Sequence, residues 1–231
     1  MFKTERNIQY SELEKDGRIG ICTILNYFQD VSTEHTEKLG YGMTRLSKEG
    51  LAWIMRTINA SVRRFPHFGE KLKIYTWTTG FEKMFGKRSF MAKDECGETV
   101  ATAASLWALV DTKQEKPVRV NDEIIRLYGI EENKVEEYIR REPDTGEVAL
   151  AGEYTVQRRD IDTNNHVNNV KFVEIASEFL PEGIKIKSLQ AFYRRAAYLG
   201  DVIYAHICEN TMGIRLKTGA GETHTVMRFT V

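Results

Sequence analysis

The stretch Arg194-Arg-Ala-Ala-Tyr-Leu-Gly-Asp-Val-Ile203 repeats an earlier one, Arg63-Arg-Phe-Pro-His-Phe-Gly-Glu-Lys-Leu-Lys-Ile74. In both, two arginines are followed after four residues by a glycine and an acid, and then by apolar residues typical of a strand. A second pair, Gly97-Glu-Thr99 and Gly221-Glu-Thr223, leads into an apolar strand in each half. Because the order and spacing of these segments are similar, the sequence predicts a duplicated structural unit.

Each half also contains one helix ahead of its strands. In the first half, Leu25, Phe28 and Val31 recur at helical spacing and Gly40 stops the pattern. In the second half, residues 167–181 are apolar around most of a helix, and Pro181 ends them. A helix that is apolar on most sides must be enclosed. The prediction is an α+β fold in which an antiparallel sheet wraps around a helix, twice.

Residues 113–150 separate the halves and are rich in charge, with weak helical periodicity. We therefore predict an N-terminal unit over residues 1–112, a charged and partly helical linker over 113–150, and a C-terminal unit over 151–231.

The composition of the chain excludes several classes of function. The chain has 231 residues, a formal net charge of zero and a pI of about 7.0, which removes any global electrostatic attraction to nucleic acid. No signal peptide and no apolar run long enough to cross a bilayer is apparent. Three cysteines form no CxxC pair. These features predict a cytoplasmic protein with no metal site, no cofactor and no disulfide framework.

The stretch from Arg159 to Asn169 is the densest cluster of catalytic residue types. Asp162, Asn164 and His166 stand at i, i+2 and i+4, so an extended segment would place all three on one face, close to a helix N-terminus near Asn168. A carboxylate, a carboxamide and an imidazole together can activate water or attack a carbonyl and stabilise the oxyanion. The alternative is a polar loop of Asx turns before an Asn-capped helix.

The string Asp-Ile-Asp-Thr-Asn-Asn-His-Val-Asn-Asn-Val-Lys-Phe, from Asp160 to Phe172, resembles the active-site motif of acyl-acyl-carrier-protein (acyl-ACP) thioesterases. Segments of the first half, among them Trp53-Ile-Met-Arg-Thr and Ala104-Ser-Leu-Trp107, resemble segments of the same family in the same order. The resemblance covers nearly the whole chain. It implies a double hot dog, two helix-in-sheet units in one polypeptide, which agrees with the duplication.

The resemblance also implies roles for individual residues. The family's catalytic Asp, Asn and His fall on Asp162, Asn164 and His166. We expect Asp162 to be the nucleophile or general base and Asn164 the oxyanion donor or carbonyl orienter. His166 is expected to position water or to protonate the leaving thiolate. Asn168 and Asn169, at the helix start, are candidate substrate-binding residues. The backbone N–H groups from Val167 to Asn169 are the other candidate oxyanion donors.

One departure from the family pattern stands out. In the plant enzymes the segment Tyr-Arg-Arg is followed by Glu-Cys, whereas here Tyr193-Arg194-Arg195 is followed by Ala196-Ala197. A cysteine mechanism at this position is therefore excluded, and no glutamate is available there to hold water.

The first half has no matching Asp, Asn and His in its approach to the helix, from Asp16 to Leu25. We expect this half to shape the acyl pocket, with Trp53, Met55 and Ile58 as candidate lining residues. The alternative is that these three are plain core.

The resemblance implies hydrolysis of acyl-ACP to free fatty acid, which ends chain elongation, with an acyl carrier protein bearing a phosphopantetheine-linked acyl chain as partner. The alternatives are an acyl-CoA thioesterase, a hot-dog protein that only binds acyl chains, and a hot-dog dehydratase, because fold alone does not select among them. Neither nucleic acid nor membrane is expected as a partner. Both a monomer and a homodimer are compatible with the sequence.

Overall fold

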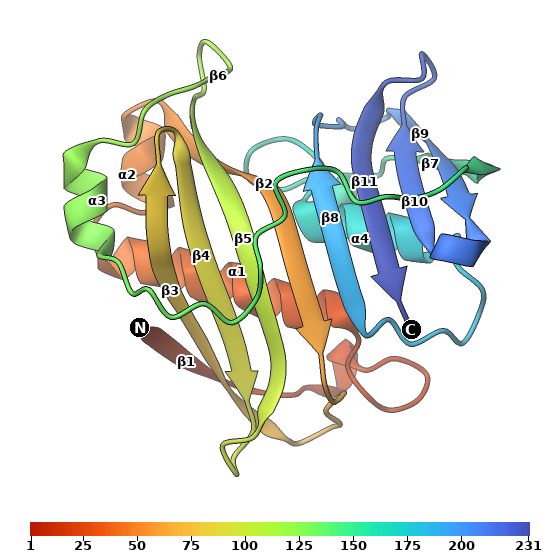
Figure 1. Cartoon of the computed structure of the whole chain (residues 1–231), viewed down its shortest axis with the longest axis horizontal. Helices are drawn as coiled ribbons and strands as arrows, with labels where there is room; N and C mark the ends of the chain where they lie inside the picture. Colours follow the sequence, from red (N-terminus) through yellow and green to blue (C-terminus); the bar gives the residue numbers. More distant parts are fainter. The chain divides into compact units, whose positions relative to one another are not determined.

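The computed structural model describes all residues from Met1 to Val231, which form two compact units. Unit 1 comprises Met1–Tyr138 and unit 2 comprises Ile139–Val231. Within each unit, antiparallel strands lie against one long helix (Figure 1).

Unit 1 has five main strands in the spatial order β1-β3-β4-β5-β2, and a short strand β6 pairs with β5. The strands are β1 (Phe2–Asn7), β2 (Leu51–Val62), β3 (Lys71–Glu82), β4 (Phe85–Lys93), β5 (Thr99–Asp111) and β6 (Lys116–Pro117). The helices are α1 (Ile21–Lys38), α2 (Met43–Lys48), α3 (Asp122–Tyr128) and the single 3-10 turn η1 (Tyr10–Glu12).

The core of unit 1 lies between α1 and the inner face of its sheet. Leu25, Phe28 and Val31 are buried along α1, as the sequence predicts, and Ile24 is buried beside them. Phe28 stacks on Phe90 of β4, with ring centroids 5.1 Å apart. The helix stops at Lys38, just before Gly40, whose φ of 73° suits glycine.

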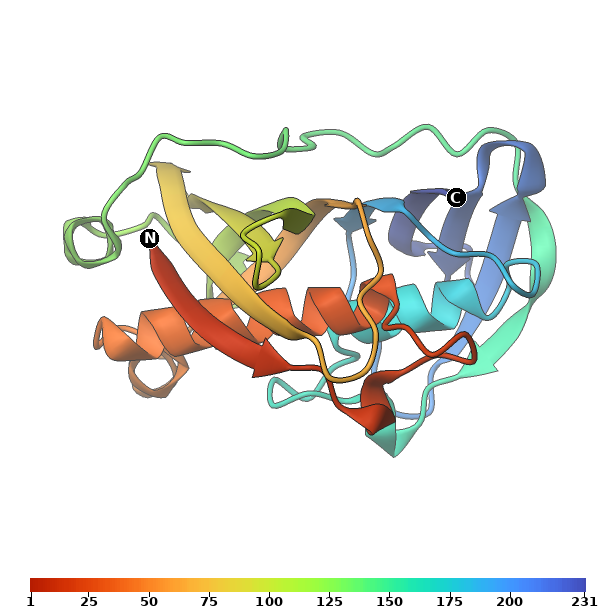
Figure 2. The same ribbon diagram turned by 90° about the horizontal axis from the view of Figure 1, so that it is seen from below.

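The outer face of this sheet is covered by residues 129–138 (Figure 2). The indole Nε1–H of Trp77 donates to the carbonyl of Asn133 at 2.6 Å, and the hydroxyl of Thr102 donates to the Glu136 carboxylate at 2.6 Å. Coverage on both faces explains why β5 is buried continuously from Val100 to Ser105 instead of alternating.

Unit 2 repeats the plan with five strands in the order β7-β9-β10-β11-β8. Read in chain order within each unit, this is the same permutation as in unit 1. The elements are β7 (Ala149–Thr155), η2 (Arg158–Asp160), α4 (Asn169–Ser177), β8 (Ser188–Tyr193), β9 (Val202–Cys208), η3 (Glu209–Thr211), β10 (Gly213–Lys217) and β11 (Thr223–Thr230). The predicted α+β double hot dog is confirmed.

The helix of unit 2 is shorter than the sequence predicts. Burial of Val170, Val173 and Ile175 agrees with an enclosed helix, but α4 ends at Ser177 and not near Pro181. Beyond Ser177 the amides of Phe179 and Leu180 bond to carbonyls three residues back, so the last turn is a tighter one.

Candidate functional site

The predicted catalytic residues lie in a closed turn between η2 and α4. Ile161 and Val167 form an isolated bridge at the base of this turn, and the Asp162 N–H donates to the His166 carbonyl at 2.9 Å. Asn165, with φ of 65°, turns the chain, and its N–H donates to the Asp162 carbonyl at 3.0 Å. The extended segment considered in the sequence analysis is therefore wrong, because these bonds fold residues 162–166 back on themselves.

The turn still keeps the three residues close together. The Asn164 N–H donates to Oδ1 of Asp162 at 2.7 Å, an Asx turn that fixes the carboxylate. Asp162 and His166 are half-buried, whereas Asn164 is exposed. The turn thus combines a carboxylate held by one N–H, an imidazole and a carboxamide within five residues. These groups are suited to acid–base chemistry on a ligand bound beside the turn.

The helix N-terminus supplies fewer free donors than the sequence suggests. The Val167 N–H bonds to the Ala197 carbonyl and the Asn168 N–H to the Asp160 carbonyl, both at 2.9 Å. The Asn168 side chain caps α4 by accepting from the Val170 N–H at 2.8 Å. Of the backbone donors proposed between Val167 and Asn169, only the Asn169 N–H has no acceptor.

Asp160 is a supporting residue that the sequence analysis did not single out. It is buried, and its Oδ2 accepts from the Tyr154 hydroxyl and from the Gln157 N–H, both at 2.8 Å. Since its carbonyl also accepts from Asn168, Asp160 ties β7 and η2 to the start of α4. The only feature of the sequence that could have indicated this role is the position of Asp160 directly before the motif.

A second supporting segment follows β8. Ala197 is fully buried and its carbonyl anchors Val167, and the ring of Tyr198 meets His166 edge-on with centroids 5.8 Å apart. Ala196 and Ala197 are the residues that depart from the family pattern. They therefore belong to the segment that contacts the motif. Ala197 contributes through its backbone, which no side-chain motif reveals.

Unit 1 contains the same turn with different side chains. The Glu14 N–H bonds to the Arg18 carbonyl at 2.8 Å and the Gly17 N–H to the Glu14 carbonyl at 3.0 Å. By these bonds Glu14, Asp16 and Arg18 correspond to Asp162, Asn164 and His166. The counterpart of the motif begins at Glu14, two residues before the segment considered from sequence, and it has no asparagine and no histidine.

The three predicted pocket residues lie on β2 of unit 1. Met55 and Ile58 are buried, and a register shift between Met55 and Thr57 interrupts the alternation of the strand. The indole Nε1–H of Trp53 donates to the Tyr128 hydroxyl at 3.2 Å. None of these contacts separates a lining role from a core role, so both predictions stand.

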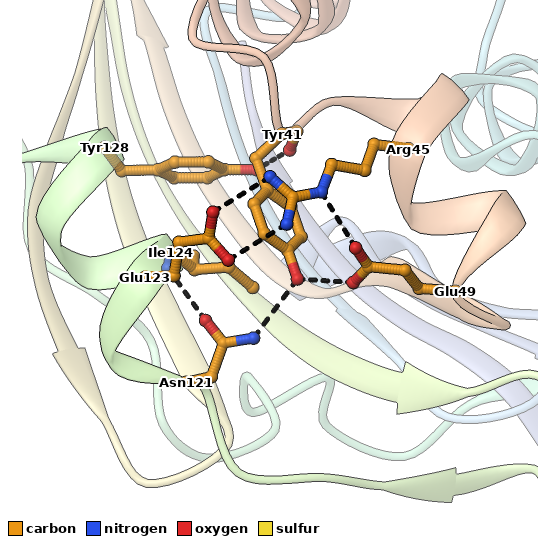
Figure 3. A network of polar contacts seen from close by, with 7 residues as sticks. All are labelled: Tyr41, Arg45, Glu49, Asn121, Glu123, Ile124 and Tyr128. Carbon is orange, nitrogen blue, oxygen red and sulfur yellow. Dashed lines mark hydrogen bonds and ion pairs between the residues drawn. The ribbon is translucent and has the colours of Figure 1, made fainter.

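A polar network holds the partner of Trp53 (Figure 3). The Tyr128 hydroxyl donates to the Tyr41 carbonyl at 2.8 Å, while the Tyr41 hydroxyl contacts Glu49 and accepts from the Asn121 amide. Arg45 forms ion pairs with Glu49 and Glu123, linking α2 to α3. Residues 121–128, predicted as linker, thus pack onto unit 1.

Comparison with known proteins gives a consistent result. The family model described as the acyl-ACP thioesterase N-terminal domain matches residues 1–128, and that of the acyl-ACP thioesterase C-terminal domain matches residues 144–228. The chain belongs to the acyl-ACP thioesterase family.

Among family relatives, the palmitoyl-acyl carrier protein thioesterase of Arabidopsis thaliana is 26% identical over 84% of this chain and 52% of its own length. The dodecanoyl-acyl-carrier-protein hydrolase of Umbellularia californica is 25% identical over 84% of this chain and 56% of its own. The chain thus spans about half the length of the curated relatives it matches.

Solved structures support the fold. An acyl-ACP thioesterase from Bacteroides thetaiotaomicron superposes with a TM-score of 0.88 at 21% identity, over 98% of this chain and 96% of that one. The 12:0-ACP thioesterase from Umbellularia californica gives 0.81 at 22% identity, over 99% and 95%. In this chain, no helix combines the length and apolar character needed to cross a membrane.

Proposed function

We propose that this chain hydrolyses the thioester of acyl-ACP and releases a free fatty acid, with Asp162, Asn164 and His166 as its catalytic residues. The observation that carries the proposal is the match of both family models, one to each unit, with the Asp-x-Asn-x-His turn in the C-terminal match. The relatives named as acyl-carrier-protein thioesterases and hydrolases support the same reaction.

In the proposed reaction, Asp162 takes a proton from water while the water oxygen bonds to the thioester carbon. Its carboxylate is fixed for this task by the Asn164 N–H. The carbonyl π electrons move to oxygen, where the Asn164 amide and the Asn169 N–H donate hydrogen bonds to the oxyanion. Collapse of the intermediate breaks the C–S bond, and His166 gives a proton to the thiolate. Direct attack by Asp162, followed by hydrolysis of the anhydride, is the alternative first step.

The two units are proposed to divide the work. The chemistry is assigned to the C-terminal unit, predicted over residues 151–231, and the acyl pocket to the N-terminal unit, predicted over 1–112, with Trp53, Met55 and Ile58 as lining. The carrier protein is the proposed partner, and a cytoplasmic location is proposed because all three cysteines remain thiols.

The test is thiol release from a matched panel of acyl-ACP and acyl-CoA thioesters of ~8 to ~18 carbons, because a hydrophobic pocket distinguishes chains that differ by methylenes. The native chain is compared with Asp162→Asn, which keeps an acceptor for the Asn164 N–H. Hydrolysis of acyl-ACP that disappears in the variant supports the proposal.

Other outcomes separate the alternatives. Faster turnover of acyl-CoA than acyl-ACP at every chain length would assign the enzyme to CoA thioesters. Retention of intact thioester by folded native protein would indicate a protein that only binds acyl chains. Loss of water from hydroxyacyl chains without thiol release would indicate a dehydratase.

A further inference from the structure

The imidazole of His166 is held by ring packing and not by hydrogen bonds. The hydrogen bond that His166 makes is through its carbonyl, which accepts from Asp162, and no group of the chain bonds to either ring nitrogen. The ring lies edge-on to that of Tyr198, with centroids 5.8 Å apart and planes at 69°. Edge-on packing at this separation is a favoured geometry for two rings. Tyr198 therefore restrains the plane of the imidazole.

This kind of restraint differs from the usual one. A histidine that transfers protons works only when the correct nitrogen faces the reacting atom, and in many enzymes a third group fixes the ring by bonding to the other nitrogen. Such a bond engages that nitrogen. A ring contact fixes the plane and leaves both nitrogens of His166 available, one for the sulfur of the thioester and one for the solvent that replaces the proton.

The backbone of Tyr198 is held on both sides, so its ring has a fixed base. Its N–H donates to Oδ2 of Asp201 at 2.9 Å, and its carbonyl accepts from the Asp201 N–H at 3.0 Å. The preceding residue, Ala197, is fully buried and accepts from the Val167 N–H at 2.9 Å. Val167 directly follows His166, so the two rings extend from backbones that are bonded to each other at the adjacent residues.

Burial does not explain where the Tyr198 ring lies. The side chain is 47% exposed, so nearly half of it gains nothing from leaving water. Ala196 and Ala197 stand where the plant pattern has Glu-Cys, and neither has a side chain longer than a methyl group. Among these three residues, the side chain that contacts the motif is that of Tyr198.

The equivalent pair in unit 1 makes no ring contact. Tyr198 corresponds to His67, because the His67 N–H donates to the Glu70 carboxylate and its carbonyl accepts from the Glu70 N–H. His166 corresponds to Arg18, whose guanidinium donates to a backbone carbonyl at 2.7 Å. The His67 ring instead lies 3.0 Å from the Glu70 carboxylate. The ring pair is thus confined to the unit that carries the motif, and the duplicated fold does not require it.

We propose that Tyr198 is a positioning residue for the reaction, whose ring holds the His166 imidazole in the orientation that delivers a proton to the leaving sulfur. The inference rests on the proposed function. As the C–S bond breaks, its electrons move to sulfur and the imidazolium gives its proton to the sulfur, which leaves a thiol and a neutral imidazole. Tyr198 takes no part in these bond changes. It keeps the imidazole facing the sulfur, which is a contribution of orientation.

Leaving groups of different basicity isolate this step. An alkyl thiolate is a poor leaving group without a proton, whereas an aryl thiolate such as para-nitrothiophenolate is a weak base and leaves unprotonated. The substrates are therefore two thioesters of one acyl chain, with N-acetylcysteamine or para-nitrothiophenol as the leaving thiol. Single-turnover rates report the chemical step apart from binding and product release.

Tyr198→Ala removes the ring and should lower the rate on the N-acetylcysteamine ester about 10- to 10²-fold. The rate on the para-nitrothiophenyl ester should fall less than about twofold, because that step needs no proton. Tyr198→Phe keeps the ring and should match the native chain on both esters. The matched control is Leu199→Ala, which removes the neighbouring side chain, 56% exposed, and should change neither rate.

Three outcomes would overturn the positioning role. The first is an equal loss on both esters, or no loss on either, in Tyr198→Ala. The second is a loss in Tyr198→Phe as large as in Tyr198→Ala, which would assign the effect to the hydroxyl. The third comes from a double-mutant cycle. In a His166→Gln background Tyr198→Ala should cause no further loss, and a loss of the same size would show that Tyr198 acts independently of His166.

Nuclear magnetic resonance tests the ring contact without substrate. The ring C–H resonances of His166, assigned by their absence from His166→Gln, should shift toward those of an isolated histidine in Tyr198→Ala and stay in place in Tyr198→Phe. Unchanged resonances in Tyr198→Ala would overturn the inference. A native chain that hydrolyses neither ester nor acyl-ACP would refute the proposed function and the proton transfer with it, whereas the resonances would still decide whether Tyr198 holds the ring.

Discussion

The turns that precede α1 and α4 have the same backbone conformation but different side chains. A bridge closes each at its base, Leu13 with Ile19 and Ile161 with Val167. A positive φ reverses each chain, 75° at Gly17 and 65° at Asn165. The duplicated unit thus has retained the hydrogen-bonded frame, while the chemistry is assigned to the side chains of one copy alone.

The acids of the two turns are used differently. A Cβ at Gly20 would lie 1.6 Å from Oε1 of Glu14, so the Glu14 carboxylate fills the space beside the N-terminus of α1. In unit 2 Asn168 caps the helix, and Asp162 accepts from the Asn164 N–H within its own turn. Glu14 therefore has a structural role at the start of its helix. Asp162 has no such role, which leaves its carboxylate free to act on a substrate.

The largest difference is expected between Asp162→Asn and Asp16→Asn. Both acids accept an N–H two residues ahead, from Asn164 at 2.7 Å and from Arg18 at 3.0 Å, and an amide oxygen can still do so. Loss of the proposed base or nucleophile should lower kcat for acyl-ACP by about 10³-fold or more, as measured by thiol release. Asp16→Asn should leave kcat unchanged.

Equal rates in the two variants, with both proteins folded by circular dichroism, would remove Asp162 from the mechanism. A loss in both would mean that the turn of unit 1 also serves the reaction.

Exchanging Asn164 for the aspartate of unit 1 tests the next role. A carboxylate cannot donate to an oxyanion, so Asn164→Asp should lower kcat about 10²- to 10³-fold with little change in melting temperature, because the side chain is exposed. Single-turnover rates separate this loss from weaker binding. A rise in KM at constant kcat would contradict the oxyanion role.

The two units also differ in their histidines, and this difference should appear in how stability depends on pH. Burial and the neighbouring Arg88 lower the pKa of His35 to about 4, while its value in the unfolded chain is about 6.5. Between these values the unfolded chain binds more protons, so this contribution is complete above about pH 6.5 and is lost as the pH falls toward 4. The slope from one such group is at most about 1.4 kcal/mol per pH unit.

Urea unfolding from about pH 7 to about pH 4.5 measures this slope. His35→Gln, which keeps an acceptor for Arg88, should flatten it. The same slope in the variant and in the native chain would assign the acid sensitivity to other groups, of which His224 is the first to test, since burial lowers its pKa too.

The smallest effect is expected at the two helix caps. Asn168→Ala removes the acceptor for the Val170 N–H and should cost about 1 kcal/mol in the free energy of unfolding. At the equivalent position, Gly20→Ala must displace the Glu14 carboxylate from the start of α1. Denaturant titration compares the two, and a stabilised Gly20→Ala would show that Glu14 contributes nothing there.

Most of the fold is visible in the sequence because repeats and periodicity report burial. The paired arginines and the Gly-acid turns predict a duplicated unit, and the spacing of Leu25, Phe28 and Val31 predicts an enclosed helix. Both units contain such a helix. The end of α4 was misplaced at Pro181, since the tighter final turn after Ser177 depends on carbonyls that no side-chain pattern reports.

The sequence predicted which residues form the candidate site, but not the backbone conformation that holds them. Spacing brought Asp162, Asn164 and His166 together, but assumed an extended segment, whereas the αL conformation of Asn165 and the bond from Asp162 to His166 produce a turn.

The strand order of unit 1 has a consequence for synthesis on the ribosome. Helix α1 is complete at Lys38, but the strand β5 that helps to enclose it ends at Asp111, about 70 residues later. At a translation rate of about 5 to 20 residues per second, the apolar face of α1 waits on the order of 4 to 15 s for its cover. During that interval the nascent chain presents Phe28 and Val31 to its surroundings, so we expect its yield in cells to depend on chaperones that bind early.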